Sequence, residues 1–208
     1  MSVETTTFEI GKNRIEALSD GIFAIVMTLL ILELHVPNLP ATAANVEVTA
    51  ALFGLWPKFV SYFVAFISLG VFWIAHHIMY LAVRRADRTL LWLNIVFFMF
   101  VSLLPFSTSV LNAFPRSLIG PFLFGANLAL DGWLLFFQWR YVGSQPGMLA
   151  SFVTIEYRST VNFRMLAVPI ATTFTAIVCF WSSGISVAIY LLLLPLYLLP
   201  GSTGRSWA

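Results

Sequence analysis

Residues 89–114, TLLWLNIVFFMFVSLLPFSTSVLNAF, contain no charged side chain and are long enough to cross a bilayer as one helix. Similar stretches occupy residues 59–83, 117–139 and 165–204, and only Asp131 interrupts them. The chain as a whole is 60% hydrophobic and 10% charged, whereas soluble domains are about a quarter charged. The sequence therefore predicts an all-α integral membrane protein.

Six crossings account for the length of 208 residues, because each crossing needs about 20 apolar residues and the connections are short. Ser182, Ser183 and Gly184 are turn residues that divide the last apolar stretch into a helical hairpin. The first apolar stretch, residues 21–32, is too short alone and must recruit polar neighbours on both sides. We expect a single six-helix domain over residues 1–208, with helices at about 13–35, 53–82, 89–113, 117–139, 162–182 and 185–200.

The basic residues predict the orientation of this bundle. Only Lys58 and Arg116 fall at one end of the predicted helices, and cytoplasmic loops carry the excess of Lys and Arg. We therefore expect both termini in the cytoplasm. An alternative is a secretory signal peptide, because Ala41-Thr42-Ala43 has the form of a cleavage site, although the segment before it carries acids as well as bases. The other nine basic residues are Lys12, Arg14, Arg84, Arg85, Arg88, Arg140, Arg158, Arg164 and Arg205.

Several polar side chains lie within the predicted crossings at a similar depth. Asp20 and Asn94 each lie roughly 9 Å beyond a basic residue at the cytoplasmic end of their helices. Ionisable side chains inside a membrane are costly and normally face the bundle interior or water. We therefore predict one interhelical hydrogen-bond network, whose members are Arg14, Ser19, Asp20, Trp73, His76, His77, Asn94 and Asp131.

Three roles are open for this network. A buried and satisfied polar layer would fix the packing of the helices, which is the role that we favour. A proton relay is an alternative, because a histidine near an aspartate can titrate close to neutral pH. Metal ligation by His76 and His77 is a further alternative, but adjacent residues on a helix point about 100° apart.

The first predicted helix carries a stripe of residues that share one face. Gly21, Ile25, Thr28 and Leu32 recur at spacings of three and four, with Leu29 close beside them. The spacing alone suits a lipid-facing stripe as well as the lining of a pore.

Three motifs on consecutive helices resemble those of the endolysosomal potassium channels and their prokaryotic homologues. The segment RIEALSDGIFAIVMTLLILEL (residues 14–34) is similar to the helix 1 signature Arg-x-x-x-Phe-Ser-Asp of that family, with Leu18 in place of the phenylalanine. The resemblance covers about residues 11–110. The second helix carries FWIAHH (residues 72–77), and the third carries LLWLN (residues 90–94) together with LLPFS (residues 103–107).

The resemblance implies a potassium-preferring cation channel without the backbone-carbonyl filter of ordinary potassium channels. In that family, prokaryotic chains with one six-helix repeat assemble as homotetramers around their first helices. Carried onto this sequence, the hydrophobic constriction positions are Ile25, Leu29 and Leu32, with Thr28 as a hydroxyl ring. We expect potassium as the permeant ion, no cofactor, and a location in the plasma membrane of a prokaryote.

Composition and residue spacing disfavour other classes of function. The formal net charge of +2 is too small for a nucleic-acid-binding surface, and Cys179 is the only cysteine. A nucleophile and base at recognisable spacing do not occur, so we do not expect an enzyme. A proton-coupled secondary transporter using Asp20, His77 and Asp131 is the alternative, although no internal repeat relates the two halves of the chain.

Overall fold

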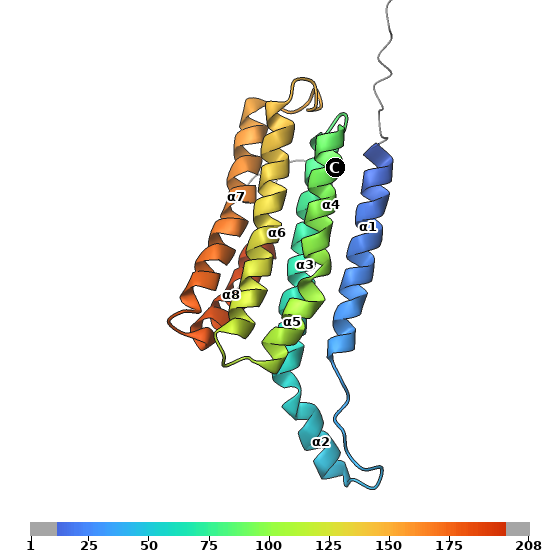
Figure 1. Cartoon of the computed structure of the whole chain (residues 1–208), viewed down its shortest axis with the longest axis vertical. Coiled ribbons are helices and arrows are strands. Elements are labelled where there is room, and N and C mark those ends of the chain that lie inside the picture. Colours follow the sequence, from blue (N-terminus) through green and yellow to red (C-terminus); the bar gives the residue numbers. More distant parts are fainter. Residues whose placement is uncertain (1–11, 199–208) are drawn as a thin grey trace, which may run out of the picture.

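Helices form nearly all the regular structure of residues 12–198, which are the residues that the computed structural model describes. In chain order they are α1 (Lys12–Leu29), the short 3-10 helix η1 (Leu30–Glu33), α2 (Asn45–Gly54), α3 (Trp56–Ala82), α4 (Arg88–Ser102), α5 (Leu104–Ala113), α6 (Ile119–Ser144), α7 (Ile155–Val178) and α8 (Ser183–Leu198). The longer helices run roughly side by side, and α2 is inclined away from them below the bundle (Figure 1).

Five helical segments of the described chain are long and apolar enough to span a membrane. They are Lys12–Glu33, Asn45–Ala82, Arg88–Ala113, Ile119–Ser144 and Ile155–Val178. The helix α8 follows as a sixth, shorter element of 16 residues. The prediction of an all-α membrane bundle is confirmed.

Prolines follow two interruptions between consecutive helices. The helix predicted at 89–113 is divided into α4 and α5, whereas the helix predicted at 53–82 corresponds to α3 and is preceded by α2, which was not predicted from the sequence. The helical hydrogen-bonding pattern is interrupted at Leu55, two residues before Pro57, so that α2 and α3 are separate helices. It breaks again at Leu103, just before Pro105, where α4 ends and α5 begins. Proline has no N–H to donate to the carbonyl four residues earlier, and its ring clashes with that carbonyl. Each new helix begins with the proline in its first turn, where the N–H is not required.

The last two helices also differ in extent from the expected segments. The helix expected at 162–182 begins at Ile155, because the hydroxyl of Thr154 accepts a hydrogen bond from Tyr157 N at 3.1 Å and caps its first turn. The helix α6 continues to Ser144, so the link between α6 and α7 is short.

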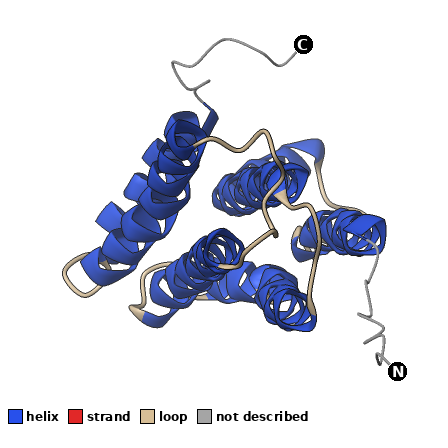
Figure 2. Cartoon of the chain, turned by 90° about the horizontal axis from the view of Figure 1, so that it is seen from above, coloured by secondary structure: helices blue, strands red, loops and turns tan. Residues whose placement is uncertain are grey.

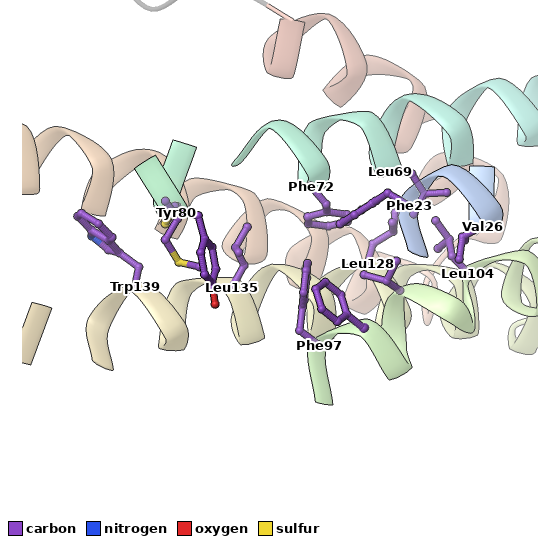
Figure 3. Close-up of a cluster of buried hydrophobic side chains, with 14 of the residues drawn as sticks. Phe23, Val26, Leu69, Phe72, Tyr80, Phe97, Leu104, Leu128, Leu135 and Trp139 are labelled. Carbon is purple, nitrogen blue, oxygen red and sulfur yellow. The ribbon is translucent and has the colours of Figure 1, made fainter. Parts of the chain in front are cut away.

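The helix α6 lies at the centre of the packing and contacts α4, α5 and α7. The helix α1 lies at the edge of the bundle, where it packs mainly against α3 and α4 (Figures 1 and 2). Its buried side chains join the core next to α4, and the rings of Phe23 and Phe97 have centroids 6.1 Å apart (Figure 3). One side of α1 is therefore held by the core and the other side is free.

Candidate functional site

The two faces of α1 differ in burial although both are largely apolar. Ile15, Ser19, Phe23 and Val26 are buried against the bundle at helical spacing. The opposite face is exposed in the single chain, and it contains the pore positions that the family resemblance implies. The exposed fractions are 60% for Ile25, 42% for Leu29 and 64% for Leu32, and Thr28 is also exposed.

Small residues occupy the same exposed face between the large ones. Ala17, Gly21 and Ala24 are exposed, and a Cβ added at Gly21 would meet no atom within 4 Å. Small side chains allow helices in membranes to approach closely. The face of α1 is therefore shaped for contact with other helices at short range.

Thr28 has its hydroxyl proton engaged on its own helix. Its Oγ1 donates to the carbonyl oxygen of Ile25 at 2.7 Å. The hydroxyl oxygen keeps its lone pairs, so it can still accept a hydrogen bond from water or coordinate a cation. The neighbours of Thr28 on this exposed face are aliphatic, so its hydroxyl supplies the oxygen at this level of the helix.

A buried chain of hydrogen bonds holds the other face of α1. Ser19 Oγ lies 3.2 Å from His76 Nδ1, and His76 Nε2 lies 2.8 Å from Asn94 Oδ1. The amide nitrogen of Asn94 donates to Leu90 O at 2.8 Å and to the hydroxyl of Tyr80. The chain therefore links α1, α3 and α4 through side chains that are buried to at least 98%.

A neutral imidazole satisfies every partner in this chain. The bond to Leu90 O fixes the orientation of the Asn94 amide, so Asn94 presents its oxygen to His76. With its proton on Nε2, the ring donates to Asn94 and accepts from the Ser19 hydroxyl. The ring also stacks on Tyr80 and Phe97, with centroids 4.5 and 5.7 Å away. Both ring nitrogens therefore have hydrogen-bond partners, and the ring packs against two aromatic side chains.

The exposed part of the predicted network lies beside the buried part. Trp73 Nε1 donates to Asp20 Oδ1 at 2.8 Å, and the His77 ring stacks on Trp73 with centroids 6.0 Å apart. Because His76 is buried and His77 is exposed, the two histidines point in different directions and do not share a site. Arg14 is exposed, and its side chain makes no hydrogen bond or ion pair with the described part of the chain.

Asp131 lies apart from the histidines, in contrast to its expected place in the same layer. It is fully buried in α6, and its Oδ2 accepts a bond from Asn127 Nδ2 at 3.3 Å. Asn127 in turn bonds to Phe100 O and to Ser107, both at 3.0 Å. Phe100 and Ser107 lie on either side of the break between α4 and α5, so Asp131 belongs to a second polar group with its own set of hydrogen bonds.

The sequence interpretation did not include several side chains of these two groups. Tyr80 lies one turn beyond His76, and Asn127 lies one turn before Asp131. The spacing of four residues on a helix was the available signal for both. Gln138 is also fully buried on α6, and neither of its side-chain polar atoms has a partner among the described residues.

These features define an all-α membrane bundle whose first helix leaves an apolar face uncovered beside a buried Ser–His–Asn chain. Residues 14–105 match the model of the family described as Endosomal/lysosomal potassium channel TMEM175. The predicted resemblance to this family is thereby confirmed over these residues.

Two relatives illustrate the similarity in sequence. A protein named a potassium channel in Streptomyces collinus is 39% identical over 105 residues, which cover 50% of this chain and 50% of that protein. The human protein named Endosomal/lysosomal proton channel TMEM175 is 39% identical over 123 residues, which cover 55% of this chain and 24% of that protein. The similarity to the bacterial relative thus extends over half of its length.

A solved structure extends the similarity in fold beyond the matched sequence. The crystal structure of a lysosomal potassium-selective channel TMEM175 homolog from Chamaesiphon minutus superimposes with a TM-score of 0.79 at 24% sequence identity. The superposition covers 90% of this chain and 96% of that one. The similarity in fold therefore extends well beyond the residues that match the family model.

Proposed function

We propose that this chain is one subunit of a homotetrameric, potassium-preferring cation channel in which four copies of α1 surround the pore. The observation that carries the proposal is the uncovered face of α1, with Ile25, Thr28, Leu29 and Leu32 exposed at the edge of the bundle. The name of the bacterial relative and the fold of the solved structure support it. Assembly would convert an exposed apolar stripe into the wall of a channel.

The wall would consist of aliphatic rings with one ring of hydroxyls. Ile25 and Leu32 are separated by seven residues, or roughly 10 Å along a helix, and Thr28 and Leu29 lie between them. Aliphatic rings offer no ligand to an ion, so they admit ions only when wide enough to hold water, and they close by dewetting. The oxygen of Thr28 supplies four acceptors at one level of such a pore.

The buried hydrogen-bond chain would set which face of α1 points to the pore. Rotation of α1 about its axis moves Ser19 away from His76, and the bond between them opposes this rotation. Asn94 holds His76 in place from α4. The network is therefore a positioning device in this proposal, and conduction takes place on the opposite face of the helix.

The remaining features of the proposal concern the surroundings of the channel. We place the chain in the plasma membrane of a prokaryote, with both termini in the cytoplasm and potassium and other monovalent cations as permeant ions. It needs no cofactor and catalyses no reaction. A coupled transporter using Asp20, His77 and Asp131 has less support, because Asp131 bonds to Asn127 and lies in a different polar group.

Reconstitution into liposomes tests the proposal. Under opposed potassium and sodium gradients the purified protein should give a current with a reversal potential displaced toward that of potassium, and the current should persist without a proton gradient. Native mass spectrometry of the same preparation should give the mass of four chains. A current that requires a proton gradient, or a stable monomer that conducts, would contradict the channel proposal.

A further inference from the structure

Two links at one end of the bundle form a single joined element. The link between α3 and α4 (residues 83–87) lies against the link between α6 and α7 (residues 145–154), at the end where α1 begins (Figure 1). Together these segments are called the paired loops. Two backbone hydrogen bonds hold them: Arg84 N to Met148 O at 2.7 Å and Ala150 N to Ala82 O at 2.9 Å.

The paired loops and the helix ends beside them carry an excess of positive charge. Arg84, Arg88 and Arg140 are exposed, and their side chains make no hydrogen bond or ion pair within the described residues. Arg85 contacts only a backbone oxygen, that of Pro146, at 3.2 Å. Over residues 82–88 and 140–158 there are five arginines and two acids, Asp87 and Glu156.

Of the two acids, Asp87 already accepts hydrogen bonds through both carboxylate oxygens. Asp87 Oδ1 accepts from Leu90 N at 2.8 Å and caps α4, while its Oδ2 accepts from the hydroxyl of Tyr141 at 2.5 Å. The bond to Tyr141 also brings the end of α6 against the start of α4. Arg88 and Arg140 are the chain neighbours of Asp87 and Tyr141, so this bond places the backbones of two exposed arginines at the same end of the bundle.

Exposed apolar side chains accompany the arginines. Phe152 is 57% exposed in the second of the paired loops, and Ile155 is 86% exposed at the start of α7. Trp92 is 57% exposed one turn into α4. Basic groups beside exposed aromatic and aliphatic groups are typical of protein surfaces that lie in the headgroup region of a bilayer. Binding of free phosphate does not require exposed apolar side chains beside the arginines.

We propose that the paired loops bind the phosphate of an anionic phospholipid headgroup, through Arg84, Arg88 and Arg140. Guanidinium groups match phosphate oxygens in a paired geometry, and the backbone bonds between the loops keep the helix ends that carry these arginines at one end of the bundle. Phe152 and Ile155 would enter the interface beside the headgroup. This binding does not depend on whether the assembled protein conducts ions.

Native mass spectrometry of the purified full-length protein can count the bound lipids. The protein would be released from micelles containing either phosphatidylglycerol or phosphatidylcholine. The parent should retain phosphatidylglycerol in preference. Each removed charge should weaken retention about fivefold, so the double variant Arg84→Gln with Arg88→Gln should bind about 25-fold more weakly. Since neither side chain makes an internal bond, the double variant should keep the parent's unfolding temperature in phosphatidylcholine.

The matched control is Lys58→Gln with Arg116→Gln, which removes two charges from the opposite end and should leave retention unchanged. Equal retention of the two lipids by the parent, or an equal loss in the control, would overturn the proposal. Inorganic phosphate provides the other arm of the test. If it displaces phosphatidylglycerol at millimolar concentration, the loops bind soluble phosphate and the lipid proposal is wrong.

Discussion

Replacement of Asn94 by alanine tests the buried hydrogen-bond chain. The side chain of Asn94 makes two bonds between helices, to His76 Nε2 at 2.8 Å and to the hydroxyl of Tyr80. Both partners are buried, at 2% and 0% exposed, so water cannot replace the amide without entering the core. We expect Asn94→Ala to lower the stability of the protein and to loosen the hold on α1 through His76 and Ser19.

The expected magnitude follows from the number of bonds lost. An interhelical hydrogen bond in a membrane contributes about 0.6 kcal/mol and at most about 1.7 kcal/mol. Two such bonds give a loss of about 1 to 3 kcal/mol in the free energy of unfolding. The estimate for a soluble core would be higher, but unfolded helices in a membrane also find partners for their polar groups.

Unfolding in mixed micelles, followed by tryptophan fluorescence, measures this difference. Asn112→Ala is the matched control, because Asn112 Nδ2 is buried without a partner among the described residues. The control should change stability by about 0.5 kcal/mol or less. Equal stability of Asn94→Ala and Asn112→Ala would refute the role of the hydrogen-bond chain.

Three further predictions concern other residues. Asp131→Asn should leave stability unchanged within about 1 kcal/mol or raise it, because Asp131 Oδ1 has no partner in the described structure; a large loss, measured by the same unfolding assay, would show a bond that the structure lacks. Thr28→Val should reduce the preference for potassium over sodium in reversal-potential measurements while the tetramer stays intact. An unchanged reversal potential would contradict a role of the Thr28 hydroxyl in selectivity. In a Cys179→Ser background, Thr42→Cys should react with an impermeant maleimide from outside intact cells and Ser151→Cys should not; the reverse pattern would invert the topology.

The bundle could be predicted from the sequence because uncharged stretches of membrane length are explicit in it. Residues 89–114 contain one such stretch, and the structure places α4 and α5 there. The break at Leu103 is a local effect of Pro105, which hydropathy does not register. The early start of α7 depends on a cap by the Thr154 side chain, and a limit drawn from apolar residues misses it.

Depth along the helices predicted part of the candidate site. It indicated that Ser19, His76 and Asn94 could meet, and the structure brings them into hydrogen-bond contact. It did not predict the partners of Asp131, whose neighbour Asn127 bonds to Phe100 and Ser107, beyond Asn94 along the chain. In the same way, the spacing of Ile25 and its neighbours showed a shared face without showing that the bundle leaves this face uncovered.

The conductance of Ile25→Asn tests most directly whether α1 lines the pore. An amide ring in place of an aliphatic ring should hold water in the constriction and lower the barrier to ions. The matched control is Ile170→Asn on α7, since Ile170 is 52% exposed and Ile25 is 60% exposed. Currents per reconstituted tetramer should rise in Ile25→Asn, with weaker potassium preference, and should equal those of the parent in Ile170→Asn. Unchanged current and selectivity in Ile25→Asn, with normal assembly, would contradict a pore lined by α1.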